Sequence, residues 1–169
     1  MTEPVRGVAP TRNGGVTVNL SVRERDLLRT LPDQLRPLVA GEETAPSVAP
    51  RLYSRGYDDD GLNAEYQELV HDDVVRQRTA ALDTFAATLD QGGVTRGRWR
   101  VELDAEQAAA WLSAVNDGRL VLGALLDITD ESAWEDGPDE DNPASVVMYY
   151  LGWLQEELVG ALMAALPDE

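Results

Sequence analysis

The sequence contains no cysteine and no lysine, and it has one histidine, His71. The absence of cysteine excludes disulfide bonds, thiolate catalysis and thiolate-bound zinc. A lone histidine also excludes the paired-histidine zinc sites of metallopeptidases. All 14 basic residues are arginine, which is typical of a GC-rich genome. We expect no catalytic residue, no cofactor and no metal, and therefore a protein that is not an enzyme.

Long hydrophobic runs without charge are also missing. The most apolar stretch, residues 144–166, is long enough to cross a bilayer, but Glu156 and Glu157 lie near its centre. Each charge at mid-membrane costs roughly 2.5–3.5 kcal/mol. The first residues lack the basic and apolar regions of a signal peptide. We therefore expect a cytoplasmic protein with no membrane contact.

Positive charge is scarce and unevenly placed. The net charge is −17, and no arginine follows Arg119. The acidic last third of the chain favours a basic protein partner, since opposite potentials steer association. The same net charge repels a phosphate backbone, so direct contact with DNA would require a local basic face.

What the sequence does contain is a strand followed by a capped helix, and this order occurs twice. Apolar and polar residues alternate over 16–20 and again over 99–103, which predicts two short strands. Each strand is followed by the spacing of a capping box, which predicts a helix start. The capping residues are Ser21 and Glu24 in the first unit, and Asp104 and Gln107 in the second. The two strands could pair in one small sheet.

Helical periodicity accounts for most of the remaining chain. It predicts a helix after Ser21 with a break at Pro32, a long helix over 62–90, a helical region over 105–128 interrupted at 116–118, and a last helix from Asn142 to about Leu166. The predicted fold is mainly α, a single-domain helical bundle with a minor two-stranded β-sheet. That domain covers residues 15–167, with an acidic loop at about 129–142. A flexible tail covers residues 1–14.

The stretch Tyr57–Asp73 holds seven acids and the single histidine, which raises the question of a cation site. An EF-hand loop with Gly61 at its sixth position fails at both ends, so the first aspartates are better explained as a helix cap. The apolar stripe of this helix begins with Leu62, Tyr66 and Leu69, and we expect it to be buried. On a helical wheel His71 lies opposite this stripe, whereas Asp73 falls within it. We predict a buried or half-buried ion pair from Asp73 to Arg76 or Arg119; a solvent-facing Asp73 is the alternative.

Arginines alternate on one face of the second predicted strand. Three arginines on one strand face could grip phosphates, and others from the N-terminal region could join them in a basic patch. The candidate residues are Arg23, Arg29, Arg96, Arg98 and Arg100, with Arg12 and Arg25 nearby in sequence. A solvated strand face that balances acids elsewhere is the interpretation we favour.

Two further features suggest protein contacts. The last helix is apolar nearly all round, which indicates a central helix or half of a homodimer contact. The candidate dimer face comprises Tyr149, Trp153, Gly160 and Ala164. Trp134 stands alone in the acidic loop, where it could anchor a partner or fold back onto its own chain.

Several of these segments together resemble a known family. They are "RLYSRGYDDDGLNAEYQEL", "HDDVVRQR", "WLSAVNDGRLVLGALLDI" and "YYLGWLQEELVGAL". Over roughly residues 15–166 the chain is similar to an actinobacterial family catalogued as a domain of unknown function, which includes the AosR oxidative-stress transcriptional regulators. The most specific pieces are Asn116-Asp117 with the following "RLVLG", and the C-terminal "LGWLQE".

The resemblance implies a cytoplasmic, non-enzymatic protein linked to transcription, with a sigma factor or another transcription component as partner. It also implies an alternative, an adaptor or scaffold linked to proteolysis and cysteine biosynthesis with no direct role in transcription. A third hypothesis from the residues is an enzyme that uses the acids of 58–73 with a divalent ion. Sensing of oxidant through paired thiols is excluded here, because the chain has no cysteine.

Overall fold

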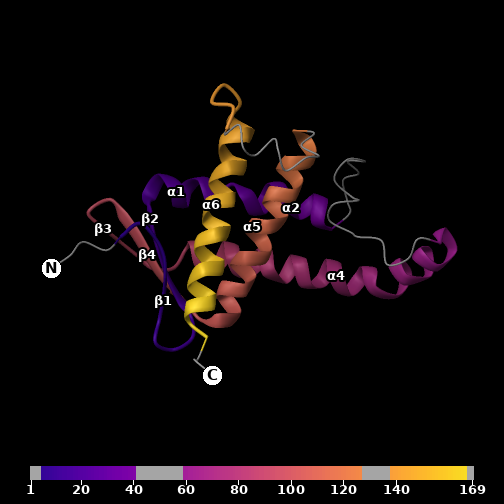
Figure 1. Ribbon diagram of the computed structural model, residues 1–169, viewed down its shortest axis with the longest axis horizontal. Coiled ribbons are helices and arrows are strands. Elements are labelled where there is room, and N and C mark those ends of the chain that lie inside the picture. Colours follow the sequence, from indigo (N-terminus) through magenta and orange to yellow (C-terminus); the bar gives the residue numbers. More distant parts are fainter. Residues whose placement is uncertain (1–4, 41–58, 127–137, 167–169) are drawn as a thin grey trace.

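The computed structural model describes residues 5–40, 59–126 and 138–166 (Figure 1). In these residues the chain forms five helices and one four-stranded antiparallel sheet with the order β1-β2-β4-β3. The strands are β1 (Gly7–Pro10), β2 (Val16–Ser21), β3 (Gly93–Thr95) and β4 (Arg98–Leu103). The helices are α1 (Val22–Arg29), α2 (Leu31–Val39), α4 (Asp60–Leu89), α5 (Ala105–Leu125) and α6 (Pro143–Ala164). The prediction of a mainly helical protein is confirmed.

The two predicted strands are β2 and β4, and they pair as neighbours with Val18 opposite Val101. The prediction of a two-stranded sheet is wrong, because β1 and β3 extend it on either side. β1 lies within residues 1–14, which were assigned to a flexible tail. Its sequence, Gly-Val-Ala-Pro, carries no alternation, and β3 is three residues long. Both strands exist because a longer neighbour supplies their hydrogen-bond partners.

The predicted helix boundaries follow from local signals, and the structure confirms most of them. Both capping boxes form: Ser21 Oγ accepts from the Glu24 N–H at 3.1 Å, and Asp104 Oδ1 accepts from the Gln107 N–H at 2.7 Å. The break before Pro32 separates α1 from α2. Asn142 caps α6, whose first residue is a proline, as the sequence indicated.

The predicted interruption at residues 116–118 is wrong, since α5 is continuous from Ala105 to Leu125. Asp117 and Gly118 are buried inside this helix. A Cβ on Gly118 would lie 3.0 Å from Leu151 Cδ1 of α6. The glycine therefore serves a close approach of two helices, and it does not end one.

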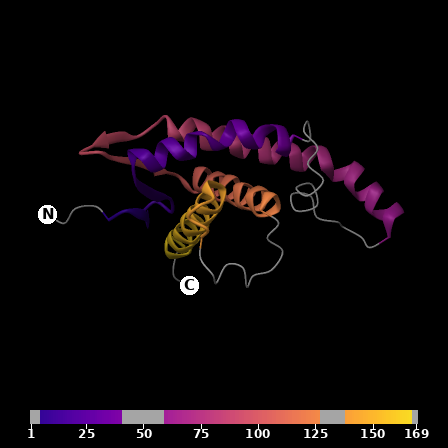
Figure 2. The same cartoon turned by 90° about the horizontal axis from the view of Figure 1, so that it is seen from above.

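The core is centred on Trp111 of α5. Its ring stacks on Trp99 of β4 at 6.1 Å between centroids, and it meets Phe85 of α4 edge-on at 4.8 Å. The indole N–H groups of both tryptophans have acceptors, Thr88 Oγ1 at 2.7 Å for Trp111 and the Gln91 carbonyl at 2.8 Å for Trp99. Figure 2 shows α1, α2 and α4 along one side of the molecule, with α5 between them and α6.

Candidate interaction surfaces

One buried ion pair joins α4 to α5. Arg78 Nη1 lies 3.3 Å from Asp117 Oδ1, and the Asp117 side chain is only 4% exposed. Asp117 Oδ2 is also buried and has no hydrogen-bond donor among the described residues. Burial raises the pKa of Asp117 to about 6, and the positive charge of Arg78 only partly opposes this.

The buried pair was predicted at other residues. Asp73 does pair with Arg76, at 3.4 Å, but both side chains are largely exposed, 69% and 76%. Arg119 makes no ion pair with Asp73 within the described part of the chain; its Nη1 donates to Gln155 Oε1. The alternative prediction, that Asp73 faces solvent, is therefore confirmed. The burial of Asp117 was not predicted, because the sequence "NDG" at 116–118 suggested a break in the helix.

The two most specific sequence pieces meet in space at the crossing of α5 and α6. Gln155 accepts from Arg119 and donates from Nε2 to Asn116 Oδ1 at 3.3 Å. Gly152 lies beneath the Arg119 guanidinium: a Cβ at this position would lie 3.5 Å from Arg119 Nε. These residues therefore hold two helices together, and their pattern reports packing.

The residues before β1 are tied to α1 and α6 by Arg6. Its guanidinium lies 3.9 Å from the centroid of the Trp153 ring, and its Nε donates to Glu24 Oε1 at 2.7 Å. Burial would raise the pKa of Glu24, but hydrogen bonds from Arg6 and from the Ser21 N–H outweigh it and hold the pKa below its usual value. Burial, and then the charge of Glu24, raise the pKa of Tyr150.

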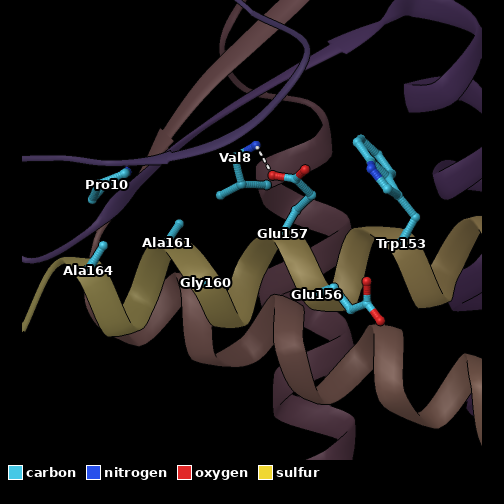
Figure 3. A pocket seen from close by; sticks show the side chains of 8 residues that line it. All are labelled: Val8, Pro10, Trp153, Glu156, Glu157, Gly160, Ala161 and Ala164. Atoms are coloured by element: carbon cyan, nitrogen blue, oxygen red, sulfur yellow. Dashed lines mark hydrogen bonds between the residues drawn. The ribbon is translucent and has the colours of Figure 1, made fainter.

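A groove of about 360 Å³ runs between β1 and α6 (Figure 3). Its lining residues are Val8, Pro10, Trp153, Glu156, Glu157, Gly160, Ala161 and Ala164. The Val8 N–H points across it to Glu157 Oε2 at 3.5 Å, and Pro10 has no N–H. The outer edge of β1 is therefore poorly suited to pair with an added strand.

The candidate dimer face lies partly along this groove. Tyr149 and Trp153 are half-buried, and Trp153 is covered on one side by Arg6. Gly160 and Ala164 are exposed, and a Cβ added to Gly160 would meet no atom within 4 Å. α6 is buried along its other side through Met148, Leu151, Leu154 and Leu158. Among the described residues α6 is therefore buried along one side only, so the prediction of a central helix is wrong, while the dimer stays a prediction.

The N-terminal half of α4 forms an exposed apolar row. Leu62, Tyr66 and Leu69 lie on one face of the helix and are 50%, 37% and 80% exposed. They were predicted to belong to the buried stripe of this helix, and only its C-terminal half is buried, through Leu82, Phe85 and Leu89. In Figures 1 and 2 the N-terminal end of α4 extends beyond the other helices of the described residues, and none of those helices covers it.

Four arginines gather at the opposite end of the molecule. Arg98 and Arg100 face outward from β4, while Trp99 and Val101 face the core. Arg96 does not lie on the strand; it occupies the β3–β4 turn with a positive φ of 54°. The Val22 N–H donates to the Gly97 carbonyl at 3.3 Å, which brings Arg23 of α1 beside this turn.

The other predicted members of the basic patch lie elsewhere or are already paired. Arg29 donates to Asp90 Oδ1 at 2.8 Å, and Arg25 to Asp26 Oδ1 at 3.2 Å. Arg12 lies beside Glu102 and Asp104, in a hollow at the other end of β4. The patch is thus narrower than predicted and consists of Arg23, Arg96, Arg98 and Arg100, which we call the arginine cluster.

Three other expectations concern the acidic loop, the membrane and metals. Trp134 and most of the loop at 129–142 lie outside the described residues. Among the residues that are described, no helix is both long and apolar enough to cross a membrane. Within the same ranges no three His, Asp or Glu side chains are grouped to hold a metal ion.

The fold and its surfaces define a mostly helical domain with a four-stranded antiparallel sheet. It presents an apolar row among acids on the N-terminal half of α4 and an arginine cluster at the β3–β4 turn; Figure 1 shows these two elements at opposite ends of the molecule. This chain belongs to the family described as "Domain of unknown function (DUF2017)", whose model matches residues 4–162.

Curated relatives come from mycobacteria. The chain is 40% identical over 108 residues to a Mycobacterium leprae protein named for the oxidative stress regulator AosR, covering 62% of this chain and 46% of that one. It is 31% identical over 146 residues to the proteins named "Oxidative stress regulator AosR" of Mycobacterium bovis and Mycobacterium tuberculosis, covering 82% of this chain and 58% of each. The chain thus spans about half the length of these relatives. No solved structure matches it significantly.

Proposed function

We propose that this chain is a non-enzymatic regulatory domain of the AosR type, which acts mainly through protein contacts made by the N-terminal half of α4. The names of its relatives at 31–40% identity support a regulatory role in oxidative stress. The observation that carries the proposal is the exposed row of Leu62, Tyr66 and Leu69. The expected partner is a sigma factor or another component of transcription.

The spacing of this row fits a helical partner. Residues at i, i+4 and i+7 are the anchors by which one helix fits against the groove or face of another. Leu69 is 80% exposed, so its burial would contribute on the order of 1.5–3 kcal/mol. Contiguous exposed apolar side chains on a rigid helix are a common feature of protein contacts.

The charges around the row select the partner. Asp60, Glu65, Asp72 and Asp73 are exposed on the same half of α4, and no arginine precedes Arg76 there. A partner surface with arginine or lysine beside its apolar residues would be steered toward this helix. A second copy of this helix half would bring like charges together, which disfavours self-association at this surface.

The test measures binding of purified sigma factors and core RNA polymerase from the host to the immobilised chain. Leu62→Ser with Leu69→Ser should weaken binding at least tenfold, since anchor residues contribute about 1 kcal/mol or more each. Met163→Ser is the matched control, because Met163 is 68% exposed on a different helix.

Two outcomes would overturn the proposal. One is equal binding by the wild type and the double variant. The other is recovery of peptidase or adaptor components, with no transcription component, when the wild type is used as bait. The second outcome would favour the adaptor or scaffold that the family resemblance implied as an alternative.

A further inference from the structure

We infer that the arginine cluster is a binding surface for the phosphodiester backbone of duplex DNA, separate from the protein contact surface on α4. These arginines were predicted to form a solvated strand face. Three structural observations favour a binding surface instead: these arginines have no acidic partner among the described residues, the turn holds one of them at its tip, and the hairpin extends past the helices.

The first observation concerns charge balance. Three arginines outside the cluster form ion pairs with acidic side chains: Arg6 with Glu24, Arg29 with Asp90, and Arg36 with Asp83. Arg23, Arg96, Arg98 and Arg100 are all exposed and have no acidic group within 4 Å in the described residues. In a chain of net charge −17, the arginines that have no acidic partner among the described residues are therefore concentrated at one place.

The net charge does not decide the potential at this place. At physiological ionic strength charges farther away than about 8 Å are largely screened, so the local groups dominate. Over residues 91–103 the chain carries three arginines and a single acid, Glu102, which lies on the side of Arg100 away from the turn. Asp90, which directly precedes this segment, and Glu24 and Asp26 of α1 are already paired with other arginines.

The second observation is the backbone of the turn. Arg96 and Gly97 both have positive φ, 54° and 75°, as a two-residue hairpin turn of type I′ requires. Asparagine, aspartate and glycine are the usual residues at such positions, and arginine adopts this conformation at a cost. Arg96 is exposed, and its side chain makes no hydrogen bond or ion pair with any described residue; the turn places this residue at the tip of the hairpin.

The third observation is shape. In Figures 1 and 2 the β3–β4 hairpin extends past the helices at the end of the molecule opposite the projecting part of α4. Arg98 and Arg100 follow the tip along one face, about 6.6 Å apart by strand geometry. β4 is paired with β2 along its whole length, so Arg98 and Arg100 lie on the face of a four-stranded sheet, and only the Arg96–Gly97 turn projects beyond it. Each strand of duplex DNA carries one phosphate per 3.4 Å of helix axis, which is a continuous row of negative charge that a row of arginines can follow.

The test uses a random-sequence duplex of about 20 base pairs, its single strand, and polyglutamate as a stand-in for an acidic protein. Fluorescence anisotropy is followed as a function of salt. For three to four phosphates neutralised, log K should fall against log [salt] with a slope of about −3. Arg98→Gln with Arg100→Gln should weaken binding to the duplex and reduce this slope by about 2. Arg29→Gln with Arg36→Gln removes the same charge from paired arginines, and it should change the slope little.

Arg96→Gly gives a second and independent variant. Glycine adopts a positive φ without strain, so this variant should fold at least as stably as the wild type, yet lose about one unit of slope. Loss of DNA binding in a protein of undiminished stability cannot be attributed to unfolding. The inference is overturned by absence of duplex binding at about 50 mM salt, by equal effects of the cluster and control variants, or by tighter binding of the single strand or polyglutamate.

Discussion

Arg78 Nη1 lies 3.3 Å from Asp117 Oδ1, and this ion pair joins the two helices that flank the core. The carboxylate is nearly fully buried, and one of its oxygens accepts no hydrogen bond from any described residue. Its desolvation is therefore only partly offset, and the pair makes the stability of the fold depend on pH.

The first prediction concerns this pH dependence. The folded pKa of Asp117 is about 6, above its ordinary value of 3.8, so the folded state binds the proton more tightly than the unfolded state does. Its contribution to stability is present in full below about pH 4 and is lost as pH rises through about 6. Asp117→Asn keeps the neutral form at every pH. Its free energy of unfolding relative to the wild type should therefore increase by about 2 kcal/mol between pH 4.5 and pH 7.

Urea denaturation of both proteins at several pH values between 4.5 and 7 provides the measurement. Because surface acids titrate alike in both proteins, their effect cancels in the difference. A difference that stays constant across this range would show that Asp117 titrates as an ordinary carboxyl group.

The second prediction compares the buried pair with the exposed one. Arg78→Gln leaves the Asp117 charge uncompensated in the interior and should cost about 3 kcal/mol at pH 7. Arg76→Gln removes the partner of Asp73 at the surface and should cost less than about 1 kcal/mol, because solvent screens that pair. Thermal or chemical unfolding of the two variants measures both values, and similar costs would contradict the assignment of the buried pair.

The third prediction compares two helical glycines. Gly160 has open space around it, so Gly160→Ala should raise the free energy of unfolding by about 0.5–1 kcal/mol through helix propensity. A Cβ at Gly118 would lie 3.0 Å from Leu151, which must shift to make room. Gly118→Ala should therefore gain less than Gly160→Ala or destabilise the fold. If both substitutions stabilised equally, the close crossing of α5 and α6 at Gly118 would be refuted.

The fourth prediction concerns the second capping box. Asp104→Ala removes the acceptor for the Gln107 N–H and should cost about 1 kcal/mol. Asp104→Asn keeps an equally good cap and should cost little. Urea unfolding midpoints distinguish the two substitutions. Equal losses would indicate that charge, and not the hydrogen bond, stabilises the start of α5.

Features set by neighbouring residues were predictable from sequence. The capping boxes at Ser21 and Asp104 need only residues three positions apart, and both formed. The pairing of β2 with β4 followed from their alternation. By contrast, "NDG" was interpreted as a helix break, because its buried role depends on Leu151 and Arg78, which are distant in sequence.

The arginine cluster shows the same division within one site. The alternation of Arg98 and Arg100 with Trp99 was visible in the sequence, and so was their outward orientation. Arg23 belongs to the cluster because the Val22 N–H donates a hydrogen bond to the Gly97 carbonyl, which could not be predicted from the sequence. Arg29 does not belong to it, because it donates a hydrogen bond to Asp90. A list of arginines does not show which of them already have acidic partners.

The sequence by itself determined that this chain is mainly helical, lacks thiol chemistry and resembles a known family, because composition, motifs and local periodicity are properties of the chain alone. Only the tertiary structure decided that Asp117 is the buried acid and that Asp73 faces solvent. It also decided that the first half of α4 is exposed. A helical wheel identifies which residues share a face, but burial depends on whether another element covers that face, and that is fixed by contacts between distant segments.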